Sequence, residues 1–207
     1  MAKRALDVIV SAIGLVLLAP LLASVAVLIR IGSPGPIFFR QERVGQHGRR
    51  FRIHKFRTMY DARTEAGRSI TVGADPRITQ IGAFLRRYKL DELPQLIDVL
   101  RGDLSLVGPR PEVPAYVECY SDADRAVVLS VRPGITDRAS IEFSNESELL
   151  ATAKDPHSFY VNEVLPVKLR YYREYVASRS MLGDLRIIRD TFGKVFFARS
   201  RATGRGL

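Results

Sequence analysis

The amino-acid sequence predicts an α+β fold that is mostly helical: an N-terminal re-entrant membrane helix broken at Pro20, a small basic β-hairpin and a helical cytoplasmic domain. Three observations carry this prediction. Residues 8–29 form an apolar run without a charged side chain, about the length that spans a membrane. Residues 37–56 alternate apolar and basic side chains around a glycine-containing turn, as in a β-hairpin. From residue 75 onward, apolar side chains recur three and four positions apart, which is typical of amphipathic helices.

The composition narrows the class of protein. The chain has 207 residues, of which 46% are hydrophobic and 26% are charged, and this excludes a disordered chain and a polytopic membrane protein. A single cysteine, Cys119, excludes an intramolecular disulfide framework and a four-cysteine zinc site, and it indicates a reducing location for most of the chain. The formal net charge of +10 favours an anionic partner, such as nucleic acid, anionic lipid or a phosphorylated small molecule.

The N-terminal apolar run has three interpretations: a cleaved signal peptide, a straight transmembrane helix and a re-entrant hairpin. A signal peptide would end sooner and precede a domain with paired cysteines. A straight helix conflicts with Pro20, which removes a backbone hydrogen bond near the middle of the run. It also conflicts with basic residues on both flanks, because such residues favour the cytoplasmic side. We therefore favour a re-entrant helix over residues 1–31, broken at Ala19 and Pro20.

Asp7 lies at the start of this run. An unpaired carboxylate at that depth in a membrane would be costly. We expect it to pair with Lys3, Arg4 or a basic residue of the domain that follows.

The rest of the chain divides into short elements. We expect residues 32–198 to form the cytoplasmic domain and residues 199–207 a basic, disordered tail. Within the domain, the patterns predict a hairpin with strands 37–41 and 51–56, a polar loop 61–74, helices 75–87 and 93–100, stiff loops 108–112 and 131–135, short helices 113–120 and 122–130, a short strand 141–144, and helices 146–153, 162–177 and 182–197.

Two adjacent carboxylates, Asp91 and Glu92, stand at the start of a predicted helix. They have a structural interpretation, because acidic residues cap helix N-termini. They also have a chemical one, in which one carboxylate is a nucleophile or base and the other holds Mg²⁺. Arg86, just upstream, would help to place an anionic substrate beside them.

Two further groups of basic residues could bind phosphate. Arg110 and Arg132 each lie beside a proline, which restricts the backbone and holds the guanidinium ready for an anion. Lys55 and Arg57 would share one face of a continuing strand. The alternative for each residue is a solvated side chain without a ligand.

Several motifs now occur in a recognisable order over residues 3–195. They are the broken apolar helix, Gly32-Ser33-Pro34-Gly35-Pro36, Gln41-Glu42-Arg43-Val44-Gly45, Lys55-Phe56-Arg57-Thr58-Met59, Leu90-Asp91-Glu92-Leu93-Pro94, Gly108-Pro109-Arg110-Pro111-Glu112 and Val131-Arg132-Pro133-Gly134. The sequence strongly resembles the bacterial sugar transferase family, the small monotopic phosphoglycosyl transferases.

The resemblance implies an enzyme of the bacterial inner membrane with its catalytic domain on the cytoplasmic face. It would transfer a sugar 1-phosphate from a UDP-sugar to polyprenyl (undecaprenyl) phosphate and release UMP, in the first membrane step of a glycoconjugate pathway. Asp91 would be the nucleophile that carries the covalent phosphosugar, and Glu92 the Mg²⁺ ligand. The resemblance places Arg110 and Pro111 near the nucleotide. It matches four other residues to basic, substrate-binding positions: Lys55, Arg57, Arg86 and Arg132.

Two other classes of function remain open from the residues alone. A membrane-anchored glycosyltransferase would use the same donor and release UDP. A non-catalytic module would bind anionic lipid or nucleic acid through the +10 charge. With the resemblance, we expect the partners to be the UDP-sugar, the polyprenyl phosphate and membrane lipids, with no nucleic acid. A membrane-associated homodimer is compatible with the sequence.

Overall fold

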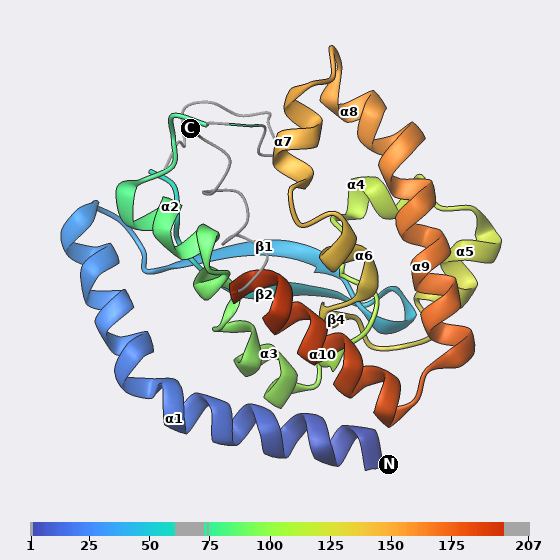
Figure 1. The fold of residues 1–207 in the computed structure, drawn as a ribbon, viewed down its shortest axis with the longest axis horizontal. Helices are drawn as coiled ribbons and strands as arrows, with labels where there is room; N and C mark the ends of the chain where they lie inside the picture. Colours follow the sequence, from blue (N-terminus) through green and yellow to red (C-terminus); the bar gives the residue numbers. More distant parts are fainter. Residues whose placement is uncertain (1, 61–72, 74, 197–207) are drawn as a thin grey trace, which may run out of the picture.

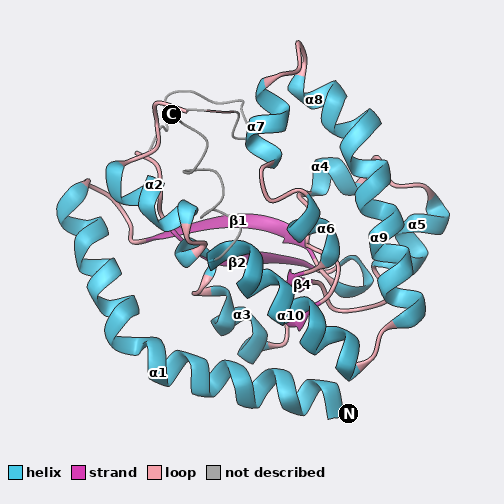
Figure 2. Ribbon diagram, viewed as in Figure 1, coloured by secondary structure: helices cyan, strands magenta, loops and turns pink. Residues whose placement is uncertain are grey.

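The computed structural model describes residues 2–60, 73 and 75–196. The predicted loop 61–74 falls almost wholly outside the described residues, and the predicted tail 199–207 falls entirely outside them. In the described part, short helices surround two small β-sheets, and a long N-terminal helix follows the lower and left edges of the molecule (Figures 1 and 2).

The long helix, α1 (Ala2–Gly32), confirms the predicted apolar helix. At the predicted break, Ala19 and Pro20, the chain stays helical, and the helix instead bends about halfway along its length (Figure 1). A proline inside a helix removes one backbone hydrogen bond and crowds the preceding turn, which bends the axis without ending the helix. The Ser24 hydroxyl donates to the Pro20 carbonyl over 2.9 Å, a contact that often accompanies a bend.

By length and composition, α1 could cross a membrane, and only 11% of its most apolar stretch is buried inside the protein. Its outward side exposes large apolar side chains such as Val16 and Leu17, whose exposed fractions are 74% and 73%. Its inward side packs Val25 and Ile29 against Phe56 and Leu85 of the domain. The helix is therefore apolar on both sides, and only one side has protein to cover it.

The predicted hairpin is present. Strand β1 (Phe38–Val44) pairs antiparallel with β2 (Arg50–Phe56), and a 3₁₀ turn (Gln46–Gly48) joins them. Both strands are longer than expected at the turn end. Inward-facing residues of β2 pack against α3 and the chain after it, which fixes the hairpin to the elements that carry the acidic pair.

A second sheet was not predicted. Strand β3 (Ser105–Val107) pairs in parallel with β4 (Gly134–Thr136), whereas residues 131–135 were expected to form a loop. The two backbones approach so closely that a Cβ at Gly134 would lie 2.1 Å from the amide nitrogen of Gly108. Only glycine permits this approach.

The helices follow the predicted order, but two predictions need correction and the helical residues 156–161 were not predicted. The helix expected from residue 75 begins later, as α2 (Gln80–Arg87), because the Thr79 side chain caps it. The strand expected at 141–144 is wrong: residues there belong to or follow α6 (Arg138–Glu142), which the Asp137 side chain caps. The others are α3 (Gln95–Arg101), α4 (Pro114–Val117), α5 (Asp122–Val128), α7 (Glu146–Ala151), α8 (Pro156–Phe159), a π-helical turn (Tyr160–Val164), α9 (Leu165–Ser178) and α10 (Met181–Phe196).

The largest buried cluster lies between α4, α5 and α9 and includes Tyr116, Leu165 and Tyr172. Val44, the last residue of β1, belongs to the same cluster. The amide of Val44 donates to the carbonyl of Glu112 over 3.0 Å. This core therefore holds the end of the hairpin beside the proline-rich loop that carries Arg110.

Candidate active site

Asp91 and Glu92 lie on a 3₁₀ turn (Leu90–Glu92) immediately before α3. Lys89, just upstream, adopts a left-handed backbone conformation with φ of 55°, which turns the chain sharply out of α2. Both carboxylates are buried. Neither caps α3, because Pro94 occupies the cap position of that helix and no side chain accepts a bond from its first amides. The capping interpretation therefore has no support in the structure.

Glu92 is the neutralised member of the pair. Its Oε1 accepts a hydrogen bond from Lys55 Nζ over 2.8 Å, and its Oε2 accepts one from Arg110 Nη1 over 3.1 Å. Arg110 Nη2 also donates to Oε1, so the guanidinium binds the carboxylate through two nitrogens. Burial alone would raise the pKa of Glu92, but Arg110 and Lys55 outweigh it and hold that pKa well below its usual value.

Asp91 has the opposite environment. Its Oδ1 is buried and has no hydrogen-bond partner among the described residues. Burial and the adjacent carboxylate of Glu92 raise the pKa of Asp91, and the nearby charges of Lys55, Lys89 and Arg86 offset only part of this. The site therefore holds one paired carboxylate beside one carboxylate with an unpaired, buried oxygen.

Arg86 and Arg110 complete the surroundings of the pair. Arg86, in the last turn of α2, donates from Nε to the Thr58 hydroxyl over 2.8 Å. Burial lowers the pKa of Arg86, and Asp91 is the first of the charges that counteract this. Arg110 also donates to the carbonyl of Ile135 on β4, over 3.4 Å. The structure thus brings three of the predicted basic residues, Lys55, Arg86 and Arg110, to the acidic pair.

Arg57 and Arg132 contact other parts of the molecule. Strand β2 ends at Phe56, so Arg57 does not continue the face of Lys55 as expected. The Arg57 guanidinium is buried and donates to the carbonyls of Ser33 and Pro34, over 2.8 and 2.7 Å, at the end of α1. Arg132 is exposed, and its Nε donates to the carbonyl of Gly102, over 3.1 Å.

Pro111 has its carbonyl in the interior. That carbonyl accepts a bond from Arg43 of β1 over 3.0 Å, and the next side chain, Glu112, lies in a buried network. The Tyr160 hydroxyl donates to Glu112 over 2.6 Å, and Lys168 lies 3.7 Å from the same carboxylate. Sequence reasoning missed this network, because its members come from β1, the loop and the C-terminal helices, and no local pattern joins them.

A second buried pair was also missed. Asp98 of α3 accepts bonds from the backbone amide of His54, over 2.8 Å, and from its ring Nδ1. The two residues are 44 positions apart, so no sequence spacing indicates the pair. The contact fixes β2 to α3, and His54 immediately precedes Lys55. The pair therefore helps to hold Lys55 at Glu92.

The acidic pair meets the requirements of a magnesium ion that also binds phosphate. Mg²⁺ is commonly held by one or two carboxylates, with substrate phosphates and water completing its shell. No larger group of metal-ligating side chains occurs among the residues that the structure describes. In the described part of the chain, Asp91 Oδ1 has no partner and Glu92 Oε2 accepts one hydrogen bond, whereas a carboxylate oxygen can accept two. Both residues therefore retain an oxygen lone pair for such an ion.

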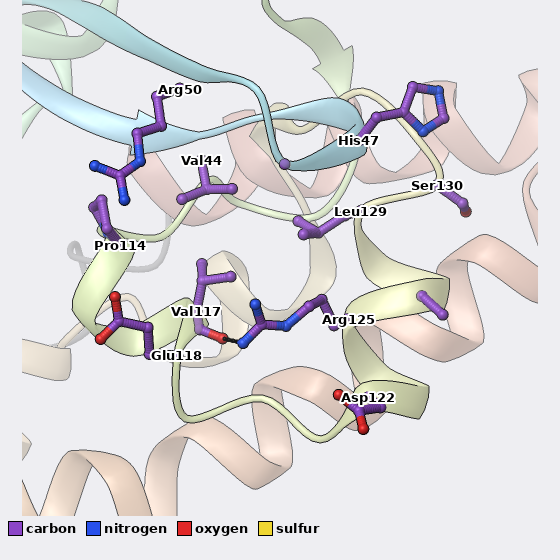
Figure 3. A pocket seen from close by; sticks show the side chains of 12 residues that line it. Val44, His47, Arg50, Pro114, Val117, Glu118, Asp122, Arg125, Leu129 and Ser130 are labelled. Atoms are coloured by element: carbon purple, nitrogen blue, oxygen red, sulfur yellow. Dashed lines mark hydrogen bonds between the residues drawn. The ribbon is translucent and has the colours of Figure 1, made fainter.

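An open pocket of about 490 Å³ lies elsewhere, between the hairpin turn and helices α4 and α5 (Figure 3). Val44, Val117 and Leu129 form its apolar wall, and Arg125 reaches across it to donate to the carbonyl of Val117 over 3.0 Å. None of the residues predicted for the site lines this pocket. We therefore place the candidate active site at the acidic pair.

Comparisons with known proteins agree on one family. The model for "Bacterial sugar transferase" matches residues 1–198. A UDP-N-acetylgalactosamine-undecaprenyl-phosphate N-acetylgalactosaminephosphotransferase of Aeromonas hydrophila is 39% identical over 76% of this chain and 38% of its own length. A UDP-glucose:undecaprenyl-phosphate glucose-1-phosphate transferase of Escherichia coli K12 is 36% identical over 94% of this chain and 40% of its own length.

The chain spans about two fifths of each of these two relatives. It covers more of the exopolysaccharide production protein ExoY of Rhizobium meliloti, which is 32% identical over 96% of this chain and 87% of its own length. The likeness thus extends over almost the whole chain and includes the turn with the two carboxylates. On this ground the chain belongs to the bacterial sugar transferase family.

Proposed function

We propose that this protein transfers a sugar 1-phosphate from a UDP-sugar to undecaprenyl phosphate and releases UMP. The relatives named for such transfers support the class of donor and acceptor. The observation that carries the proposal is the asymmetry of the acidic pair. Glu92 is neutralised by Arg110 and Lys55, while the adjacent Asp91 keeps an unpaired buried oxygen. One carboxylate is thus suited to attack phosphorus and the other to organise positive charge.

In the first step, Asp91 would attack the phosphorus that bears the sugar. An Asp91 oxygen–phosphorus bond forms, the bond from that phosphorus to the bridging diphosphate oxygen breaks, and UMP leaves with the bridging oxygen. In the second step, a phosphate oxygen of undecaprenyl phosphate attacks the same phosphorus and releases the Asp91 carboxylate. The product is the lipid diphosphate sugar. A carboxylate without partners is a better nucleophile than one held in an ion pair, which supports Asp91 over Glu92.

A carboxylate can approach a diphosphate only when the negative charges are neutralised. Glu92 would hold Mg²⁺, which when bound supplies positive charge to the phosphate oxygens. Lys55, Arg86 and Arg110 lie at the acidic pair and would bind the phosphates and the leaving group. The contacts of Arg57 and Arg132 do not support a direct role for them in binding substrate.

The arrangement of α1 supports a site at the membrane surface. A straight helix of this length spans about 46 Å, so a simple crossing would carry one end about 30 Å away from the domain. Instead the N-terminal end contacts the domain through Lys3 and Asp184, and the C-terminal end contacts it through Arg57. We therefore favour re-entrant insertion of α1 at the cytoplasmic face of the inner membrane, where the lipid phosphate lies.

The nucleotide product tests the proposal. Purified protein in membrane mimetic would receive Mg²⁺, undecaprenyl phosphate and a panel of UDP-sugars, with Asp91→Asn in parallel. We expect UMP from the wild type with at least one donor, and a loss of at least about 10³-fold in the variant. UDP as product would instead mean that the sugar alone is transferred. UMP from Asp91→Asn at the wild-type rate would remove Asp91 from the mechanism.

A further inference from the structure

We propose that Asp7, in the second turn of α1, is a positioning residue for Arg110. In this arrangement, Asp7 fixes strand β3 and thereby sets the distance between Arg110 and Glu92. The membrane helix would thus determine the geometry of the reacting site as well as its location. The expected effect of Asp7 on UMP release rests on the function proposed above. The expected effect of Asp7 on amide hydrogen exchange near Arg110 does not.

Asp7 is a buried carboxylate on the inward side of a largely apolar helix. Its exposed fraction is 3%. Its Oδ2 accepts a hydrogen bond from the Ser105 hydroxyl over 2.8 Å, and its Oδ1 accepts one from the amide of Leu106 over 3.3 Å. Lys3 lies one turn earlier, with its Nζ 3.9 Å from Asp7. Asp7 therefore contacts two consecutive residues of β3.

The turn of α1 before Asp7 is also linked to the end of β3, through α10. Lys3 Nζ donates to Asp184 of α10 over 2.6 Å. The Tyr175 hydroxyl lies 3.0 Å from Asp184 and 2.9 Å from the carbonyl of Val107, the last residue of β3. All three residues of β3 thus have a polar contact that leads to α1.

The backbone between β3 and Arg110 is held by hydrogen bonds at each residue. After Val107, the amide of Gly108 donates to the carbonyl of Thr136 over 3.1 Å, and the amide of Gly134 donates to the carbonyl of Pro109 over 2.9 Å. Prolines on both sides restrict the backbone of Arg110 further. A displacement of β3 is therefore transmitted to the guanidinium that neutralises Glu92, through a contiguous chain of contacts.

The test compares Asp7→Asn with a matched control, Ser11→Ala, one turn further along α1. Ser11 is fully buried, and its hydroxyl has no partner among the described residues, so the control removes a polar group without removing a bond. For UMP release, we expect Asp7→Asn to lower kcat about tenfold or more with less than about a threefold change in KM for the UDP-sugar, and Ser11→Ala to match the wild type.

A double-mutant cycle with Arg110→Lys separates positioning from general destabilisation. If Asp7 acts through Arg110, the double variant Asp7→Asn/Arg110→Lys is no slower than Arg110→Lys alone. Independent losses that multiply would overturn the proposal. Ser105→Ala provides a second variant, since it removes one donor to Asp7 and leaves the carboxylate in place, and we expect a smaller loss of kcat in the same cycle.

Amide hydrogen exchange gives a readout that does not depend on catalysis. The amides of Gly108 and Gly134 do not contact Asp7, yet they join β3 to β4 before Arg110. We expect both to exchange faster in Asp7→Asn than in Ser11→Ala. A change confined to Leu106 would mean that Asp7 is only a local anchor. If the wild type releases no UMP, the proposed function fails. The exchange rates of the Gly108 and Gly134 amides still test the proposal for Asp7, because they do not depend on catalysis.

Discussion

Two neighbouring carboxylates acquire opposite properties because their partners differ. Arg110 and Lys55 bind the oxygens of Glu92, which lowers the pKa of that group against the effect of burial. Asp91 is buried beside the negative charge of Glu92 and lacks such partners, so its pKa is raised. The folded protein therefore favours the ionised form of Glu92 and disfavours that of Asp91.

We predict that Asp91→Asn stabilises the fold while abolishing activity. The raised pKa means that the folded protein disfavours the ionised form, and the substitution removes that cost at neutral pH. Without added Mg²⁺, we expect a gain of about 1 kcal/mol in the free energy of unfolding. The gain should vanish below about pH 3.8, where Asp91 is protonated in both states. Denaturant unfolding at pH 7 and at low pH measures it, and a less stable variant at pH 7 would contradict it.

Glu92→Gln should have the opposite effect. The substitution leaves Lys55 and Arg110 without the charge that pairs them, and breaking such a buried pair costs about 3 kcal/mol. Because the pKa of Glu92 is lowered, its contribution is fully present above its unfolded pKa of about 4.3 and is lost as pH falls through the folded value. Thermal unfolding from pH 7 downward checks this: the two proteins should converge in acid. Equal Tm values at pH 7 would disprove the pairing.

The sequence predicted some of these partners and not others, for physical reasons. The flanking prolines predicted an Arg110 guanidinium held ready for an anion, and the resemblance placed it near the nucleotide, but neither predicted its ion pair with Glu92. Arg57 could not be placed from the sequence, because the alternation that assigned its face stops where β2 ends at Phe56. The unpaired oxygen of Asp91 has no sequence signal at all, since it depends on where distant cations lie.

Among the elements, the junction between α1 and the hairpin is bonded by two arginines, Arg30 and Arg57. Arg57 lies in the interior and donates to the carbonyls of Ser33 and Pro34, which immediately follow the last residue of α1. It is thus part of the connection between the membrane helix and the domain. The turn at residues 33–36 has no strand or helix of its own to hold it.

We predict that Arg57→Ala lowers stability and leaves substrate affinity unchanged. Loss of charged hydrogen bonds to buried carbonyls costs about 2 kcal/mol, or about 4–8 °C in Tm for a chain of this size. Arg132→Ala is the control, because its exposed side chain makes a single bond to Gly102 and should change Tm little. An increase of tenfold or more in KM for the UDP-sugar in Arg57→Ala would restore the substrate-binding role that the sequence predicted.

Elements were predictable where they are long and regular, and less so where a single side chain caps a short helix. The hairpin and the long helices follow from alternation and helical spacing. Strands β3 and β4 have three residues each and pair in parallel from positions about 30 residues apart, so no local pattern reveals them. Residues 141–144 look like a strand, but Asp137 caps a short helix just before them. Thr79 likewise moves the start of α2.

At the scale of the whole molecule, α1 curves around one side of the domain and contacts it near both ends (Figure 1). If this arrangement persists in a bilayer, the two ends of α1 lie on the same side. The single cysteine, Cys119, is exposed on the domain and provides a reference for that side.

We predict that a cysteine introduced by Ala2→Cys reacts from the same side of the membrane as Cys119. Oriented vesicles would be treated with a membrane-impermeant maleimide, using Ala2→Cys/Cys119→Ser and the wild type in parallel. Both cysteines should be modified in inside-out vesicles, and neither in right-side-out vesicles without detergent. Modification from opposite sides would show that α1 crosses the bilayer.

The ion pair between Lys3 and Asp184 joins residues 181 positions apart. Chains are synthesised from the N-terminus at about 5–20 residues per second, so roughly 9–36 s pass between the making of the two partners. During this time the first turns of α1 can already be at the membrane, while α10 does not yet exist. Until α10 is made, Lys3 lacks its partner Asp184. Because this ion pair forms late, substitutions near the N-terminus should impair folding during synthesis more than they impair the activity of the folded enzyme.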